Sequence, residues 1–147
     1  MIDLQSGKVR FDDGFEVSCA TTIAQLERSV STKRSPATPD HTQLSIGAHI
    51  SGQRNWGVGA MFFRERLKQI WLQCLDADRV DPEAWDIGNE KARKKFHDEF
   101  LMVACSGKSA FEASPASLGW AFSWGKISSI IDMRGVQALI VVDYSQC

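Results

Sequence analysis

The sequence lacks the features that mark membrane, secreted and metal-cluster proteins. None of its apolar runs approaches the roughly 20 residues that a membrane-spanning helix needs. Residues 1–8 have neither the basic start nor the apolar middle of a secretory signal, so we expect a cytoplasmic protein that does not associate with membranes. No Cys-x-x-Cys motif occurs among the 4 cysteines, which indicates free thiols rather than a zinc knuckle or a redox motif.

The chain also has no surplus of one charge. It contains 17 Lys and Arg residues against 18 Asp and Glu residues, so the overall charge does not favour a nucleic-acid partner. A local basic cluster occurs at Lys91, Arg93, Lys94 and Lys95. Because Lys94 and Lys95 each have an acidic residue four positions further on, we interpret this cluster as a solvated helix face and expect no nucleic-acid binding.

Sequence signatures of catalysis are absent as well. There is no Gly-x-Ser-x-Gly nucleophile elbow and no His-x-x-x-His spacing. His41, His49 and His97 are far apart in the sequence and are expected at the surface or its rim, with His49 on the polar face of a strand. We therefore expect no metal, no cofactor and no catalytic residue, and we favour a protein that is not an enzyme.

Local patterns predict strands and two helices within a single domain, residues 1–147. Asp13-Gly14 indicates a hairpin turn, and Thr22 with Gln25 has the form of a capping box that begins a helix. The Pro-containing residues 31–41 are expected to form an exposed loop. The predicted elements, in chain order, are a hairpin at 8–18, a helix at 22–30, strands at 42–50, 56–63 and 67–75, a long helix from about 86–89 onwards, and a final hairpin within 120–144.

This ββαβββαββ order contains no βαβ spacing that would require a parallel sheet. It predicts an α+β fold with one twisted antiparallel sheet and two helices packed on one face. The last strand is apolar on both sides and is expected at the centre of the sheet. In the long helix, an apolar stripe of Ala92, Phe96, Phe100 and Val103 is expected to face the core.

The 5 tryptophans are numerous for this length, and tryptophan is common both in cores and in interfaces. Trp71 is expected on the polar face of its strand, between Gln69 and Gln73. Trp120 and Trp124 stand at the entrance to the final hairpin. Together with His49, these three tryptophans are candidate partner-binding residues. The alternative is that the tryptophans fill the core or cover an edge of the sheet.

The C-terminal part of the chain resembles small bacterial proteins of poorly characterised role. Their ends combine a Phe-x-Trp-Gly motif, an Asp-x-x-Gly turn and an alternating strand that ends in tyrosine. The matching residues are Phe122-Ser123-Trp124-Gly125, Asp132-Met133-Arg134-Gly135 and Ile140-Val141-Val142-Asp143-Tyr144. Some of these proteins look like immunity partners of bacterial toxins, cytoplasmic domains that bind and block one toxin. The resemblance implies such a role but assigns no functional residue.

These observations favour a non-enzymatic, cytoplasmic interaction protein of bacterial type, and the resemblance implies an immunity protein with a toxin-like protein as its partner. The alternative is a small-molecule-binding or enzymatic domain whose site lies between the sheet and the 31–41 loop. A deep pocket in which His41 or His49 meets a carboxylate would favour the alternative. A shallow site with an accessible Trp71 would favour the interaction protein. The oligomeric state stays open.

Overall fold

The computed structural model describes residues 1–81, 83–114 and 116–147. In these residues, eight strands form one sheet in the order β3-β4-β5-β6-β10-β9-β8-β7, and every neighbouring pair is antiparallel. The strands are β3 (Lys33–Thr38), β4 (His41–Ser51), β5 (Arg54–Phe63), β6 (Arg66–Cys74), β7 (Glu112–Ala113), β8 (Ser117–Phe122), β9 (Gly125–Asp132) and β10 (Gln137–Asp143).

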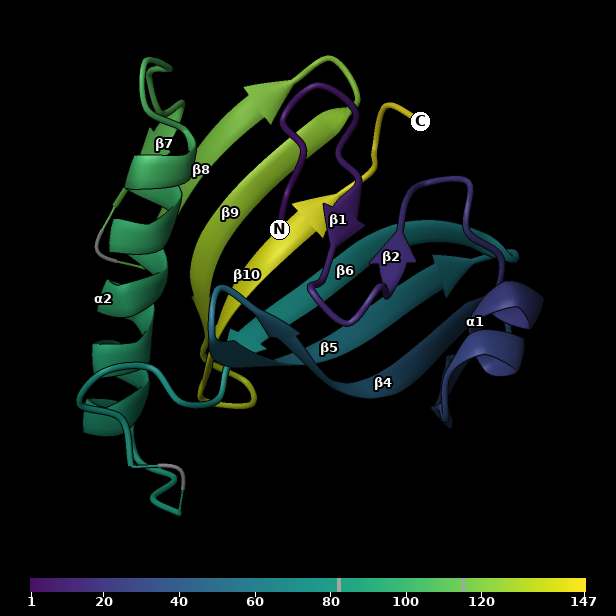
Figure 1. Ribbon diagram of the computed structural model, residues 1–147, viewed down its shortest axis with the longest axis horizontal. Helices are drawn as coiled ribbons and strands as arrows, with labels where there is room; N and C mark the ends of the chain where they lie inside the picture. The colour runs from purple at the N-terminus through teal and green to yellow at the C-terminus, as the bar shows by residue number, and fades with distance from the viewer. Residues whose placement is uncertain (82, 115) are drawn as a thin grey trace.

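The remaining elements are a short hairpin and two helices. The hairpin pairs β1 (Val9–Arg10) with β2 (Glu16–Val17), and the helices are α1 (Ile23–Ser29) and α2 (Ile87–Ala104). Figure 1 shows the sheet curving around the hairpin, with α2 beside the β7–β9 end and α1 on the opposite side of the molecule. The α+β class, the antiparallel sheet and the two helices are confirmed.

Local sequence signals explain where the first elements begin and turn. Gly14 has a φ of 88°, as the predicted Asp-Gly turn requires, and links the two strands of the hairpin. The Thr22 hydroxyl accepts a hydrogen bond from Gln25 N, while the Gln25 side chain accepts one from Thr22 N. The predicted capping box therefore begins α1.

Two segments add strands to the predicted order. Residues 33–38 are not an exposed loop but pair with β4 as the edge strand β3. Proline is tolerated at such an edge, because one side of the strand makes no ladder hydrogen bonds. The residues before Trp120 form β7 and the start of β8, which extend the sheet beyond β9.

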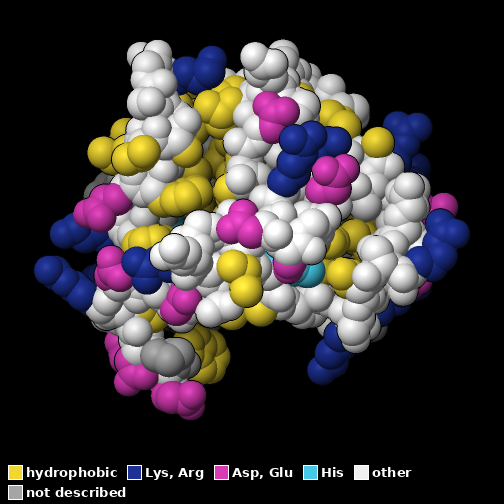
Figure 2. All heavy atoms as spheres, viewed as in Figure 1, with side chains coloured by type: hydrophobic (Ala, Val, Ile, Leu, Met, Phe, Trp, Pro, Cys, Tyr) yellow, Lys and Arg dark blue, Asp and Glu magenta, His cyan; other side chains and the backbone are white. Residues whose placement is uncertain are grey.

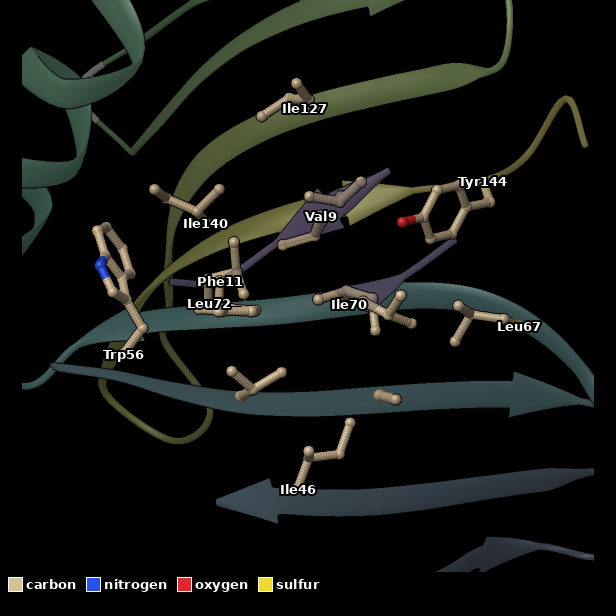
Figure 3. Packing of buried hydrophobic residues seen from close by; sticks show 14 of the residues in the cluster. Val9, Phe11, Ile46, Trp56, Leu67, Ile70, Leu72, Ile127, Ile140 and Tyr144 are labelled. Carbon is tan, nitrogen blue, oxygen red and sulfur yellow. The ribbon is translucent and has the colours of Figure 1, made fainter. Parts of the chain in front are cut away.

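The core lies on one side of the sheet, which we call the inner face. Its centre comes from the two middle strands, where Ile70, Leu72 and Ile140 are fully buried. Figure 3 shows Val9 of the N-terminal hairpin among these three side chains. Residues far apart in the sequence thus pack into one core. Strand β10 has the central position in the sheet that was predicted for it.

Helix α2 packs on the inner face through a side that the sequence pattern did not indicate. Val103 of the predicted apolar stripe is 77% exposed, whereas Glu90, Arg93 and His97 are buried. The contacting side is rotated by roughly a third of a turn from the predicted stripe. Phe96 and Phe100 are only half-buried at its border, where their rings lie 6.3 Å and 5.2 Å from that of Trp56.

The sheet determines which side of α2 is buried, because strands β6 and β10 separate beside this helix. The last paired residues of β6 and β10 at this end are Leu72 and Ile140, so Cys74 and Ala138 lie beyond the ladder. Ala138 N donates to Glu90 Oε2 at 2.7 Å. Arg93 Nε donates to Cys74 O at 2.9 Å, and Cys74 N donates to His97 Nε2 at 3.1 Å. Polar side chains of α2 therefore satisfy the backbone groups that the separated strands leave behind.

Candidate functional site

The best candidate site is the opposite side of the sheet, which we call the outer face. Strand residues that alternate with the core residues point to this side, among them Gln69, Trp71 and Gln73. Two hollows of about 370 and 470 Å³ open on the outer face. All of their lining residues belong to strands, apart from Leu75, so neither described helix contributes to them.

Trp71 lies between the two hollows and lines both. Its indole Nε1 donates to Gln69 Oε1 at 3.2 Å, and Gln69 Nε2 donates in turn to Asp143 Oδ2 at 3.0 Å. On the other side, Gly59 of β5 lies next to the indole ring, and a Cβ at this position would come within 3.1 Å of Trp71 Cε3. A half-buried aromatic ring is therefore held in one orientation at the surface.

A single row of paired residues crosses the sheet through Trp71. Trp71 pairs with Gly59 on one side and with Val141 on the other, and the row continues to Ser128 and Gly119. The ring of Phe111 lies over Gly119, where a Cβ would approach Phe111 Cε1 to 3.1 Å. Two aromatic rings thus rest beside two glycines of this row, and the glycines lie roughly 19 Å apart, as four strand spacings require.

The first hollow has mainly neutral chemistry, whereas the charged residues Lys126, Asp132 and Asp143 contribute to the lining of the second. Three glutamines, Gln43, Gln73 and Gln137, line the first hollow together with Ser45. Their amides can both donate and accept hydrogen bonds. Figure 2 shows the opposite side of the molecule, where the N-terminal hairpin lies in front of the sheet, and there Lys, Arg, Asp and Glu side chains are intermingled rather than sorted by sign. The first hollow therefore suits recognition by shape and hydrogen bonding more than by strong electrostatic attraction.

Trp71 lies on a polar strand face, as predicted, whereas Trp120 and Trp124 lie in the core, which is the alternative given for the tryptophans. These two side chains are only 4% and 6% exposed and belong to the core. Their indole nitrogens donate to the backbone oxygens of Lys108 and Leu4, respectively. Trp124 packs directly on Gly7, where a Cβ would lie 2.6 Å from its ring. The core alternative therefore holds for both.

His49 is also misplaced by the sequence pattern. It was expected on the polar face, but a bulge in β4 between Ser45 and Gly47 reverses the alternation. His49 consequently points inward, is 8% exposed and stacks on Phe15 at a centroid distance of 4.1 Å. Its Nδ1 lies 2.8 Å from Asp13 Oδ2, which fixes the hairpin turn to β4. His49 therefore lies on the inner face and not beside Trp71 on the outer face.

The basic cluster on α2 is only partly solvated. Lys91 and Lys95 are exposed, but Arg93 and Lys94 are buried, which corrects the prediction of a solvated face. Arg93 forms an ion pair with Glu90. Lys94 pairs with Asp98 at 2.6 Å, as its spacing predicts. Two of the four basic side chains of this cluster are thus buried and paired with acidic residues of the same helix.

Residues 33–38, where a loop beside a ligand site was expected, form strand β3, and Ser35 of this strand lines the first hollow. His41 contacts Thr38 Oγ1 at 2.8 Å, and neither His41 nor His49 lines the two hollows beside Trp71. In residues 1–81, 83–114 and 116–147, no group of three or more His, Cys, Asp and Glu side chains is placed to hold a metal ion. Neither described helix has the length and apolar character needed to cross a membrane.

Two exposed aromatic residues were not among the candidate partner-binding residues predicted from the sequence. Trp85 is 74% exposed, and its Nε1 donates to Val136 O at 3.3 Å. It lies just before Asp86, the N-cap of α2, and so belongs to no periodic element. Phe111 stands before β7 and is also exposed. In the sequence, the only indication that either residue is exposed was the presence of a large aromatic side chain in a segment without helical or strand periodicity.

The fold and the site define an α+β protein whose antiparallel sheet builds the core with one face and presents a fixed aromatic, amide-rich surface with the other. Comparisons with protein-family models, curated proteins and solved structures found no match.

Proposed function

We propose that this chain is a non-enzymatic binding domain that recognises a protein partner through its outer face. The observation that carries the proposal is Trp71, which is held between two hollows by Gln69 and Gly59. A tryptophan with a fixed ring contributes contact area at small entropic cost, and such residues often dominate binding energy at interfaces. The adjacent hollows offer room for side chains of the partner.

The C-terminal resemblance to toxin-immunity proteins gives this proposal a specific form, in which the partner is a bacterial toxin that the domain blocks in the cytoplasm. Binding alone would be sufficient for such a role, so no catalytic residue is required. The neutral first hollow supports a partner surface that is also mainly uncharged where it meets this hollow.

Pull-down from cells that also express the neighbouring open reading frames tests the proposal, with three versions of the domain as bait. Wild type and Met102→Ala are expected to recover the same stoichiometric partner, because Met102 is an exposed residue of α2. Trp71→Ala is expected to lose at least about 2 kcal/mol of binding, a fall in affinity of more than tenfold. Equal recovery by all three baits would contradict a binding site at Trp71.

A small neutral ligand is the second candidate, because the first hollow combines three glutamines, two serines and the indole ring of Trp71. Titration with libraries of neutral polar compounds, followed through the indole NMR signal of Trp71, separates the two. Saturable shifts confined to this hollow would favour the small ligand. Their absence, together with a Trp71-dependent protein partner, would favour the protein.

A further inference from the structure

A third hollow, of about 520 Å³, opens where β6 and β10 separate. Its lining includes Gln73 of β6, Gln137 of β10, Trp85, and the buried residues Glu90 and Arg93 of α2. In Figure 1, β6 ends and β10 begins on the side of the sheet that faces α2. The same two glutamines also line the first hollow of the outer face. The third hollow therefore adjoins the surface that we propose for the partner.

Trp85 is presented to solvent beside this hollow in a fixed position. Its side chain is largely exposed, and its indole Nε1 donates to Val136 O at 3.3 Å. The segment before it is tied to α2 by Asn89, whose side-chain nitrogen donates to Asp81 O at 2.8 Å and to Ala84 O at 2.7 Å. Because these bonds already hold the indole, a ligand that packs on it has little ordering cost to overcome.

Arg93 offers hydrogen-bond donors to the same hollow. Its buried guanidinium donates from Nε to Cys74 O at 2.9 Å and pairs with Glu90 through Nη1. No residue that the structure describes accepts from Nη2, which carries two of the five guanidinium hydrogens. Nη2 is not among the described polar atoms that are fully enclosed without a partner, so it is reached from the hollow that Arg93 lines. A carbonyl oxygen placed in the hollow would accept from it.

The surroundings of Trp85 are acidic. Residues 80–90 contain no Lys or Arg but four acidic residues, Asp81, Glu83, Asp86 and Glu90. Of these, Glu83 is exposed and lines the hollow. Since the carboxylates of Glu83 and Glu90 outnumber the single guanidinium in the lining, the hollow favours a cationic group over an anionic one.

We infer that the partner of the outer face inserts a lysine or arginine residue into the third hollow. The cationic side chain of this residue lies on the Trp85 ring and faces Glu83, while its backbone carbonyl oxygen accepts from Arg93 Nη2. A cation is attracted to the negative face of an aromatic ring, and tryptophan is the best of the aromatic side chains for this contact. The inference rests on the proposed function, because the third hollow adjoins the first.

A small compound tests the third hollow without the partner. The probe is Nα-acetyl-arginine amide, and its control is Nα-acetyl-citrulline amide, which has nearly the same shape without the charge. In NMR titrations of the folded protein, the arginine compound is expected to shift the indole signal of Trp85 saturably. It is expected to bind about threefold or more tightly than the citrulline compound. The side-chain signals of Arg93 are expected to shift with both compounds, since both supply the carbonyl oxygen.

Matched variants assign the binding to the named groups. Trp85→Ala is expected to weaken binding of the arginine compound about fivefold or more, and Glu83→Gln to remove most of its advantage over the citrulline compound. Both residues are exposed, so these variants are expected to fold. Met102→Ala is expected to bind as wild type. Equal binding of the two compounds to wild type, or a Trp85 signal that does not move up to about 50 mM of either, would overturn the inference.

The pull-down that tests the proposed function separates the two proposals. As baits, Trp85→Ala and Glu83→Gln are each expected to lose about threefold or more in affinity for the partner, whereas Met102→Ala is expected to match wild type. A loss through Trp71→Ala with full affinity in both third-hollow variants would overturn the inference and leave the proposed function in place. Full affinity of Trp71→Ala would contradict the proposed function and, with it, the inference.

Discussion

The inner face beside α2 and the outer face around Trp71 both carry hydrogen-bonded polar side chains, but these side chains satisfy different groups. On the inner face, Glu90, Arg93 and His97 bind backbone atoms of Ala138 and Cys74 in the opening between β6 and β10. These backbone groups are buried and have no ladder partner, so the helix must supply one.

On the outer face, the polar groups bind one another. Trp71, Gln69 and Asp143 form a chain of side-chain hydrogen bonds, all in half-buried positions at the surface. Water can replace any of these bonds, so their loss leaves no buried group unsatisfied. The comparison indicates that polar residues on the inner face maintain the fold, whereas those on the outer face are available for recognition.

The largest expected effect is at Glu90. Glu90→Ala removes the acceptor of Ala138 N and leaves the buried Arg93 guanidinium without its carboxylate partner. Loss of one member of a buried ion pair typically lowers the free energy of unfolding by about 3–5 kcal/mol. Denaturant unfolding measures this, with Lys91→Ala at the exposed neighbouring position as the control, expected to change it by under about 0.5 kcal/mol. Similar values for both variants would remove the distinction between the two faces.

An intermediate effect is expected from protonation of His97. Burial, and then the positive charges of Arg93 and Lys94, lower the pKa of His97 from 6.5 to about 3. As the pH falls below about 6.5, the unfolded chain binds a proton that the folded chain excludes, so stability decreases by up to about 1.4 kcal/mol per pH unit. Between pH 7 and 4.5 the loss from this group is about 2–3 kcal/mol.

The matched variant for this prediction is His97→Gln, whose amide oxygen can still accept from Cys74 N but does not titrate. Its stability between pH 7 and 4.5 is expected to fall by about 2–3 kcal/mol less than that of wild type. Chemical denaturation at a series of pH values supplies the measurement. Parallel curves for the two proteins would show that His97 is not held neutral by the fold.

Much of the fold could be predicted because its signals are local. The Asp13-Gly14 turn, the Thr22 capping box and the period-two pattern of residues 56–63 each require only neighbouring residues, and each is found in the structure. The position of Trp71 followed from the same alternation. Its polar neighbours Gln69 and Gln73 already indicated the outer face.

The features that could not be predicted depend on contacts between distant segments. The buried side of α2 is set by Cys74 and Ala138, which belong to two separated strands, and no helical pattern contains that information. The bulge at Gly47 that turns His49 inward is likewise a property of the β4–β5 register. Trp124 became a core residue only because the N-terminal segment folds over it, with Leu4 O as its hydrogen-bond partner.

The smallest expected effect on stability is at Gln69, on the outer face. Gln69→Ala removes the acceptor of Trp71 Nε1 and the donor to Asp143, but water can reach these groups. The free energy of unfolding is therefore expected to change by about 1 kcal/mol or less, while the indole of Trp71 becomes more mobile. NMR relaxation of the Trp71 indole measures that mobility, with Gln73→Ala on the same strand face as the control. If Gln69→Ala lowers the free energy of unfolding as much as Glu90→Ala does, the hydrogen bonds of the outer face maintain the fold. That result would contradict the proposed difference between the two faces.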